Sequence, residues 1–423
     1  MPIDQTLLDD LEWRGLIAHS TDIDALREAL ASGSVRYYVG FDPTAPSLHM
    51  GNLLQIVTAM RLQRAGHTPF VLVGGATGMI GDPRDSGERT LNSHDTVREW
   101  EAKVRAQIEP FLAFEGENAA TMVNNLDWTQ NLSTIDFLRD IGKHFPVNRM
   151  LARETVKRRL EAGGISYTEF SYVLLQSMDF LNLFRTHGVS LQFGGSDQWG
   201  NITGGAELIR RAESGTAHAF ATPLITKADG TKYGKTEGGA LWLDPTMLSP
   251  YAFFQFWLNA EDEKVGELLR VFTFLEHAEI EEVEALTAEK PFLRTGQKRL
   301  AEEMTTLVHG AEETARIQAA SAALFGGGDM SGLSGETLGA ALREAGSVQV
   351  ARDELTSLVD LFVTAGLVAG RNEARRAIKE GGAYLNNVRV SDGDVVPGAE
   401  DLVGGSWLVL RKGKKNFKGV EVV

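Results

Sequence analysis

VRYYVGF at residues 35–41 is the first of three consecutive segments that indicate the fold, and it is followed by LHMGNLLQIVTAMRLQ at 48–63 and PFVLVGG at 69–75. The first and third segments are apolar and rich in β-branched and aromatic residues, as buried strands are, and the middle segment has helical periodicity. Asp42-Pro43 ends the first strand because proline has no backbone N–H, and Ser47 is the expected cap of the helix. The stretch predicts a strand–helix–strand unit with parallel strands.

Two further strand candidates lie outside this unit, ATMVNNL at 120–126 and VSLQFGG at 189–195. Helical segments such as 134–141 and 172–184 separate them from their neighbours. Strands that alternate with helices predict an α/β fold, in which helices cover both faces of a parallel sheet.

The character of the chain changes after SPYAFFQFWLN at 249–259, where acidic helical stretches continue to residue 325. GGGDMSGLSG at 326–335 is typical of a flexible linker. Helical patterns at 354–364 and 371–380 then precede the short strands AYLNNVRV and SWLVLRKG. We therefore expect a parallel-sheet domain at 1–247, a helical domain at 248–325, a linker at 326–350 and a small α+β domain at 351–423.

Composition excludes several classes of protein. The 423 residues are 43% hydrophobic and 23% charged, which is ordinary for a soluble globular protein. An apolar leader and a window of about 18 apolar residues are both missing, so we expect a cytoplasmic protein that does not enter a membrane. Because the chain has no cysteine, it has no disulfide, thiolate nucleophile, iron-sulfur cluster or cysteine-ligated zinc.

The charge is unevenly distributed. A net charge of -15 argues against a protein that coats nucleic acid with its whole surface. Residues 371–423 differ, with ten Lys or Arg against seven Asp or Glu. RKGKKNFK at 411–418 holds five of these positive charges. A solvated end is the simpler interpretation, and an RNA-binding surface is the alternative. Four further basic residues recur at helical spacing: Arg371, Arg375, Arg376 and Lys379.

Two motifs suggest a polyphosphate. His49 and Asn52 lie three residues apart on the first turn of a predicted helix, where the helix dipole favours an anion. Lys232 and Lys235 belong to the glycine-containing segment KADGTKYGKT, and two mobile ammonium groups suit a leaving polyphosphate. Taken singly, a plain capped helix and an exposed basic hairpin are the simpler interpretations.

Three motifs suggest a small polar ligand at the same edge of the sheet. QFGGSDQWGN at 192–201 and GGATGMIGDP at 74–83 are glycine-rich strand exits, which let the backbone approach a ligand closely. YTEFSYVLLQSMD at 167–179 places three polar side chains on one face of an apolar helix. Buried polar groups need partners, which an internal network or a ligand with an amine and a hydroxyl would supply.

Taken together, the order and spacing of these motifs resemble the bacterial tyrosyl-tRNA synthetases of class I. The motifs are GFDPTAPSLHMGN, GGATGMIGDP, VNNLDW, YTEFSYVLLQSMD, LQFGGSDQWGN and KYGKT. The resemblance is specific over residues 35–240 and good over 350–420. It implies a Rossmann-type catalytic domain, a helical anticodon-binding domain and a C-terminal RNA-binding domain. The substrates would be ATP with Mg²⁺, tyrosine and tRNA(Tyr), the assembly would be a homodimer, and no dedicated protein metal site is expected.

The resemblance also assigns roles to residues. The tyrosine site would comprise Tyr38 and Asp179 at the phenol, Asp82, Tyr172 and Gln176 at the ammonium group, and Asn125, Gln192 and Gln198 around the pocket. The ATP site would comprise Gly40, Asp42, His49, Gly195, Asp197 and Lys235, and the catalytic residues would be Thr44, His49, Asn52, Lys232 and Lys235. The tRNA contacts would be Arg371, Arg375, Arg376, Lys412, Lys414 and Lys415.

Two departures from the family pattern are visible. His49-Met50-Gly51-Asn52 stands where the family has His-Ile-Gly-His, and 232–236, KYGKT, where it has Lys-Met-Ser-Lys-Ser. Asn52 carries no charge, so we expect it to bind an oxygen of the nucleotide without acid–base chemistry.

Three other functions are compatible with parts of the pattern. A tryptophanyl-tRNA synthetase shares the architecture but has no use for a carboxylate aimed at a phenol, so Tyr38 with Asp179 argues against it. A non-catalytic RNA-binding protein on the same scaffold would tolerate loss of His49, Lys232, Lys235 or Asp197, and all four are present. A dehydrogenase would carry Gly-x-Gly-x-x-Gly after its first strand, and this sequence does not.

Overall fold

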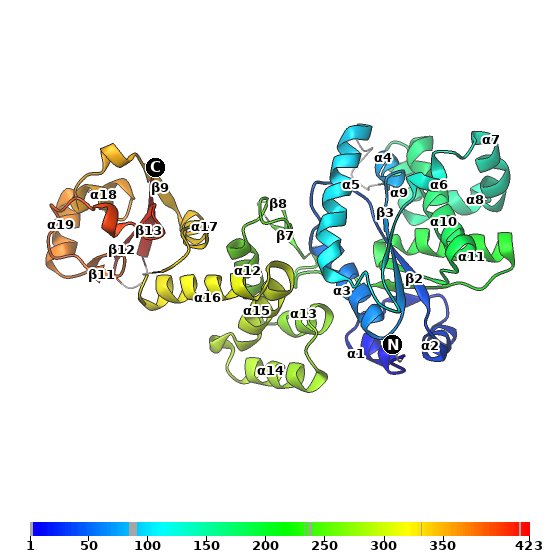
Figure 1. The fold of residues 1–423 in the computed structure, drawn as a ribbon, viewed down its shortest axis with the longest axis horizontal. Helices are drawn as coiled ribbons and strands as arrows, with labels where there is room; N and C mark the ends of the chain where they lie inside the picture. Colours follow the sequence, from blue (N-terminus) through cyan, green and yellow to red (C-terminus); the bar gives the residue numbers. More distant parts are fainter. Residues whose placement is uncertain (1–2, 84–90, 232, 237–238, 331, 414–415) are drawn as a thin grey trace. The chain divides into compact units, whose positions relative to one another are not determined.

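The computed structural model describes residues 3–83, 91–231, 233–236, 239–330, 332–413 and 416–423, with only the backbone of Lys235 and Thr236. These residues form two compact units (Figure 1). Unit 1 comprises Met1–Asp244 and Glu263–Glu282, and unit 2 comprises Pro245–Asp262 and Val283–Val423.

Unit 1 is built on a six-stranded sheet with the order β1-β6-β5-β2-β3-β4. All neighbours are parallel except β1, which is antiparallel to β6. The α/β prediction is confirmed, and the ends of the four predicted strands are within two residues of those observed. The strands are β1 (His19–Ser20), β2 (Arg36–Phe41), β3 (Thr68–Val73), β4 (Thr121–Asn124), β5 (Leu191–Gly195) and β6 (His218–Thr222).

Helices cover both faces of this sheet. Figure 1 shows α3 and α5 on one side of β2 and β3, and α10 and α11 on the other. On the second side, Phe180 and Leu183 of α10 pack in one core with Phe70 and Leu72 of β3. The helices of unit 1 are α1 (Leu7–Trp13), α2 (Ile23–Ser32), α3 (Met50–Arg64), α4 (Thr77–Ile80), α5 (His94–Ile108), α6 (Leu126–Thr129), α7 (Thr134–Asp136), a π-helix (Phe137–Ile141), α8 (Val147–Leu151), α9 (Glu154–Ala162), α10 (Tyr167–His187), α11 (Trp199–Glu213) and α13 (Val265–Phe272).

The strand order reverses between β2 and β5. The chain runs outward through β2, β3 and β4, and then returns to add β5 and β6 on the other side of β2. In parallel sheets, ligands bind beyond the carboxyl ends of the strands at such a reversal. The topology therefore predicts a ligand site at the residues that follow Phe41 of β2 and Gly195 of β5.

Residues 263–282 belong to unit 1, although the sequence predicts them as part of a helical domain at 248–325. The reason is the buried side chain of Arg14, whose guanidinium donates to the backbone carbonyls of Arg270 (3.1 Å) and Leu275 (2.8 Å). A buried guanidinium needs acceptors, and backbone carbonyls in the last turn of α13 and just beyond it supply them. Helical periodicity alone does not reveal this attachment.

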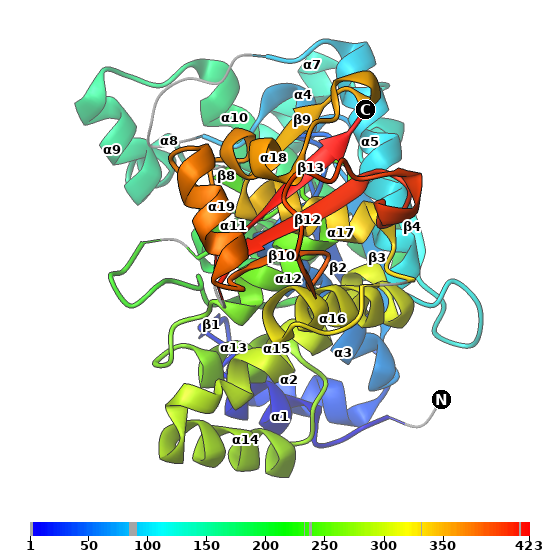
Figure 2. The same ribbon diagram turned by 90° about the vertical axis from the view of Figure 1, so that its left-hand side faces the viewer.

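Unit 2 combines helices with a second sheet, which has the order β11-β10-β12-β13-β9. Its helices are α12 (Pro250–Leu258), α15 (Thr295–His309), α16 (Ala311–Gly326), α17 (Gly335–Ala345), α18 (Leu358–Thr364) and α19 (Arg371–Lys379), and α14 (His277–Glu289) crosses from unit 1. Its strands are β9 (Ser347–Val350), β10 (Ala383–Leu385), β11 (Val388–Arg389), β12 (Trp407–Lys412) and β13 (Asn416–Val422). Figure 2 shows β12 and β13 as the long central strands of this sheet.

Strand β12 is buried on both faces. Leu408 and Leu410 pack in one core with residues of α18 and α19. Trp407 points to the opposite face, where its ring lies so close to Gly339 of α17 that a Cβ there would be 2.8 Å away. Because successive side chains of a strand alternate, β12 joins the helices on its two faces.

The predicted linker at 326–350 is wrong for residues 335–350. This range contains α17 and β9, and β9 pairs in parallel with β13. Leu338 and Leu342 of α17 are buried. Glycines around residue 330 suggest a linker, but the apolar spacing that follows them marks a helix packed on the sheet.

Among the residues that the structure describes, we find no helix long and apolar enough to cross a membrane.

Candidate active site

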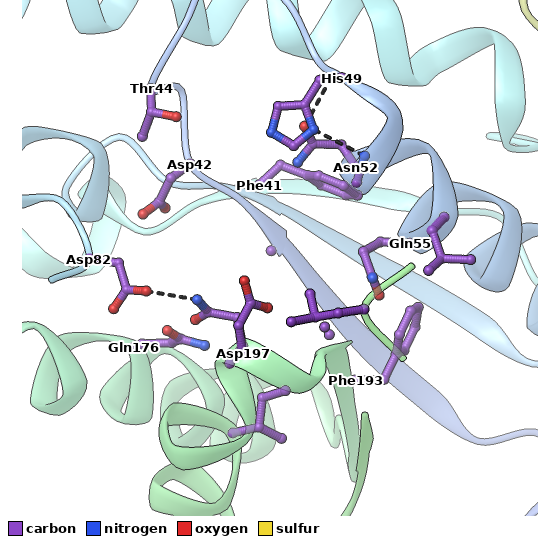
Figure 3. Close-up of a pocket in the computed structure, with 18 of the residues that line it drawn as sticks. Phe41, Asp42, Thr44, His49, Asn52, Gln55, Asp82, Gln176, Phe193 and Asp197 are labelled. Carbon is purple, nitrogen blue, oxygen red and sulfur yellow. Dashed lines mark hydrogen bonds between the residues drawn. The ribbon is translucent and has the colours of Figure 1, made fainter. Parts of the chain in front are cut away.

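A cavity of about 400 Å³ lies in unit 1 beyond the carboxyl ends of β2 and β5. Most of the predicted site residues line it, and Figure 3 shows Thr44, His49 and Asn52 toward one end and Asp82 and Gln176 toward another. The predicted residues that line the cavity are Tyr38, Gly40, Asp42, Thr44, His49, Asn52, Asp82, Tyr172, Gln176, Asp179, Gln192, Gly195, Asp197 and Gln198.

Asp179 is the most deeply placed carboxylate of the cavity. It is 1% exposed, and it accepts hydrogen bonds from Asn125 Nδ2 (3.0 Å) and Trp128 Nε1 (2.9 Å). Burial raises its pKa to about 7, although both hydrogen bonds favour the ionised form. The carboxylate is thus held in a fixed direction at a high energetic cost, which is typical of functional groups.

Asn125 is predicted to line the pocket, but it is buried behind the residues that do. Its side chain donates to Asp179 and to Thr77 Oγ1 (2.9 Å) and accepts from the N–H of Ala76 (2.8 Å), so it orients Asp179 from behind. Trp128 has the same function, and the sequence reasoning misses it. Its only sequence signal is its place at the end of VNNLDW, because indole nitrogens need an acceptor when buried.

Tyr38 on β2 and Gln192 on β5 are paired neighbours in the sheet, and both line the cavity together with Asp179. Burial and the charges of Asp179 and Asp42 raise the pKa of Tyr38 well above its ordinary value, so its hydroxyl is a donor at neutral pH. Gln176 and Gln192 each have a buried oxygen that accepts no hydrogen bond from the described part of the chain. A ligand with donor groups would satisfy these oxygens.

Asp82 forms a second acidic point of the cavity. It accepts hydrogen bonds from Gln198 Nε2 (2.7 Å) and Asn201 Nδ2 (3.1 Å). Tyr172 donates its hydroxyl to Asp42 (2.7 Å), and burial raises the pKa of Tyr172 well above its ordinary value. An acidic, partly enclosed site of this kind favours a cation such as an ammonium group.

His49 is the N-cap of α3, and the prediction that Ser47 caps this helix is wrong. The N–H of Gly51 donates to His49 Nδ1 (3.0 Å), and the N–H of His49 donates to Asn52 Oδ1 (3.0 Å). Ser47 instead donates its hydroxyl to the carbonyl of Leu48 (2.8 Å). Because Nδ1 of His49 accepts, the neutral ring carries its proton on Nε2. His49 Nε2 and Asn52 Nδ2 are therefore donors at the helix N-terminus, where anions bind.

The lysine motif adjoins the same cavity. Tyr233 and Gly234 line it, and the carbonyl of Gly234 accepts from the N–H of Leu241 (2.8 Å), whose own carbonyl accepts from Met50 at the start of α3 (3.1 Å). Lys235 begins β7 (Lys235–Thr236), which pairs with β8 (Gly239–Ala240). All of Lys232 and the side chain of Lys235 lie outside the described residues.

The basic residues of the C-terminal part have mixed surroundings. Arg371, Arg375 and Arg376 are exposed on α19, although Arg371 pairs with Asp360 and Arg375 with Asp394. Lys412 pairs with Glu373, and Lys414 and Lys415 lie outside the described residues.

The segment 411–418 is predicted as one basic cluster, and that is wrong for two of its cations. Arg411 is 6% exposed and donates to the carbonyl of Leu324. Lys418 donates to the carbonyl of Ala345 (2.8 Å). Both therefore hold the C-terminal sheet against helices of unit 2. A charge count along the sequence does not distinguish such contacts from free charge.

Within the described ranges, we find no group of three or more His, Asp or Glu side chains placed to hold a metal ion.

Comparisons with known proteins cover nearly the whole chain. Residues 31–326 match the family model for class I tRNA synthetases (W and Y), and residues 338–420 match the model for the tyrosine–tRNA ligase SYY-like C-terminal domain. The tyrosine–tRNA ligase of Streptomyces coelicolor is 61% identical over 418 residues, which are 98% of this chain and 99% of that protein. The tyrosine–tRNA ligase of Streptomyces avermitilis is 62% identical over the same length and shares of both chains.

A solved structure is also similar. It is that of a C-terminally truncated mitochondrial tyrosyl-tRNA synthetase from Aspergillus nidulans, with a TM-score of 0.68 and 31% identity, over 75% of this chain and 94% of that one.

Proposed function

Because the chain belongs to the class I tRNA synthetases, among the tyrosine–tRNA ligases, we propose how its cavity performs that reaction. Tyrosine binds with its phenol at Asp179 and Tyr38 and its ammonium group at Asp82, Tyr172 and Gln176. ATP with its Mg²⁺ binds toward α3 and the carboxyl end of β5. The observation that carries this assignment is the buried pair of an ionisable acceptor, Asp179, and a neutral donor, Tyr38, at one end of the cavity.

A phenolic hydroxyl is both a donor and an acceptor, so this pair satisfies it completely. An indole has only a donor and a larger ring system, and phenylalanine has neither polar group. The pair therefore supports tyrosine over tryptophan and phenylalanine.

The first step needs no nucleophile from the protein. An oxygen of the tyrosine carboxylate attacks the α-phosphorus of ATP, the bond to the bridging oxygen of the β-phosphate breaks, and pyrophosphate leaves. Positioning and charge stabilisation supply the acceleration. We assign the phosphates to Thr44, His49, Asn52, Lys232 and Lys235, and the remaining parts of ATP to Gly40, Asp42, Gly195 and Asp197. In the second step a ribose hydroxyl at the 3′ end of tRNA(Tyr) attacks the tyrosyl carbonyl, and AMP leaves.

The pH dependence of tyrosine use tests the role of Asp179. In the free protein its pKa is about 7, so the carboxylate that accepts from the phenol becomes protonated as the pH falls below 7. We expect kcat/KM for tyrosine to fall on the acid side of pH 7, by up to about tenfold per pH unit. The same profile for ATP at saturating tyrosine is the control, because Asp179 is then already occupied. If Asp179→Asn keeps the inflection, another group causes it.

Unit 2 and its C-terminal sheet are the proposed tRNA-binding part, with the anticodon at the helical region within 248–325 and RNA phosphates at 351–423. The exposed face of α19 supports this, since it carries Arg371, Arg375 and Arg376. A local positive surface restores encounter with RNA for a chain of net charge -15.

Replacing these three arginines with alanine is expected to weaken tRNA binding and to flatten its salt dependence, by about one unit of slope for each RNA phosphate that is no longer neutralised. The measurement is tRNA binding and aminoacylation across a salt series. ATP–pyrophosphate exchange should stay near wild type. Arg210→Ala on α11 is the matched control, since Arg210 is also exposed and paired with a glutamate but lies outside the proposed tRNA-binding part. If both variants show the same salt dependence of tRNA binding, the three arginines do not contact RNA phosphates.

We also propose a cytoplasmic homodimer. The consecutive elements α7 to α8 carry exposed apolar side chains, with Ile135 69% and Val147 60% exposed. Burial of such side chains against a second copy of the chain would remove apolar surface from water. Sedimentation equilibrium tests the proposal, since a mass near one chain at micromolar concentration would contradict it.

A further inference from the structure

Asn201 connects the acidic point at Asp82 to an arginine outside the cavity. It lies in the first turn of α11, and its Nδ2 donates to Asp82 Oδ1 (3.1 Å) and to Gln198 Oε1 (3.0 Å). Its Oδ1 accepts from Arg153 Nη1 (3.3 Å). Asn201 and Arg153 do not line the cavity, so they can act on a ligand only through the residues that do.

Arg153 determines which way the amide of Asn201 faces. A guanidinium has only donors, so the amide oxygen must face Arg153 and the amide nitrogen must face Asp82. If the amide rotated by 180°, its oxygen would meet the carboxylate and two acceptors would be opposed. The orientation of the Gln198 amide is fixed in turn. Its oxygen accepts from Asn201, so its nitrogen faces Asp82 and donates to it (2.7 Å).

The guanidinium of Arg153 lies beside two glycines of α11. A Cβ at Gly204 would lie 3.0 Å from Arg153 Nη2, and one at Gly200 would lie 3.7 Å from Nη1. A side chain at Gly204 would crowd the guanidinium, whereas one at Gly200 would make an ordinary contact with it. Burial lowers the pKa of Arg153, but the negative charge of Asp82 raises it, so the side chain remains a cation and a donor.

We propose that Asn201 and Arg153 are positioning residues that hold Asp82 and Gln198 in the arrangement that receives the α-ammonium group of the substrate. The two amide donors orient the carboxylate of Asp82 toward the cation. This inference rests on the proposed role of Asp82 in the tyrosine site. Preorganised acceptors bind a charged group more tightly, because they need no reorganisation when it arrives.

The test uses three ligands that differ at one group. Tyrosine and tyramine both carry the ammonium group, and 3-(4-hydroxyphenyl)propionate lacks it. Their dissociation constants are measured on the full-length chain by calorimetry or by inhibition of exchange. We expect Asn201→Ala to weaken tyrosine and tyramine by about tenfold, and Arg153→Met by about threefold to fivefold. The propionate should change by less than about twofold, since its affinity does not depend on Asp82.

Two further variants sharpen the result. Arg153→Lys keeps a donor and should recover most of the affinity for tyramine. Arg149→Met is the matched control, because Arg149 lines the neighbouring cavity with Arg153 but pairs with Glu207. Arg153 lies outside the site, so its variants remain informative even if Asn201→Ala does not fold.

Equal weakening of all three ligands, or wild-type affinities in Arg153→Met, would overturn the inference. Failure of the proposed function is a separate result: wild type and Asp82→Asn would then bind tyramine equally well.

Discussion

Asp179→Asn is expected to reduce the preference for tyrosine over phenylalanine by roughly 10- to 100-fold. In the native protein, phenylalanine leaves the buried carboxylate without the phenol that would satisfy it, and this penalty rejects the wrong substrate. The variant has an amide at this position and therefore no negative charge. Asn125 and Trp128 both donate hydrogen bonds to Asp179, so the amide nitrogen of the variant would face one of these donors. The measurement is the ratio of kcat/KM values for the two amino acids in ATP–pyrophosphate exchange.

Two comparisons make this result specific to the phenol. Tyr38→Phe removes the donor and should lower the same ratio by about tenfold. Asp82→Asn should weaken both amino acids equally, because both carry the ammonium group. Unchanged discrimination in Asp179→Asn and Tyr38→Phe would remove both residues from the phenol site.

Lys232→Ala and Lys235→Ala should each slow adenylate formation by roughly 100- to 1000-fold and leave tyrosine affinity within about twofold of wild type. The negative charge on the bridging oxygen grows as pyrophosphate leaves, so the ammonium groups are needed mainly in the transition state. Their neighbours Tyr233 and Gly234 line the cavity together with Met50 and Gly51 at the start of α3.

Single-turnover kinetics separate the rate of adenylate formation from binding. Lys227→Ala is the matched control, since Lys227 belongs to the same sequence segment, KADGTKYGKT, but does not line the cavity. If tyrosine affinity falls in step with the rate, the two lysines bind the ground state and the assignment is incorrect.

Much of the fold can be predicted because it depends on local pattern. The apolar runs at 35–41 and 69–75 are buried strands whatever surrounds them, and the helix between them forces a parallel connection. The parallel sheet in turn explains why strand-end residues such as Asp42 and Asp197 are predicted to meet, although they are far apart in the sequence. Carboxyl ends of parallel strands share one edge.

The features that cannot be predicted depend on partners distant in sequence. Trp128 and Asn125 turn their side chains to Asp179, and Arg411 turns inward to the carbonyl of Leu324. The direction of each of these side chains depends on tertiary packing, which the spacing of residues along the sequence does not reveal. The cap of α3 shows the same effect, since Ser47 is the better cap by type but the register of the loop places His49 at that position.

ATP–pyrophosphate exchange with each of the twenty amino acids is the sharpest test of the proposed tyrosine site, because it reports the chemistry of the cavity without tRNA. We expect rapid exchange with tyrosine and, at equal concentration, rates lower by orders of magnitude with phenylalanine and tryptophan. Exchange with tryptophan as fast as with tyrosine, or no exchange with tyrosine, would contradict it.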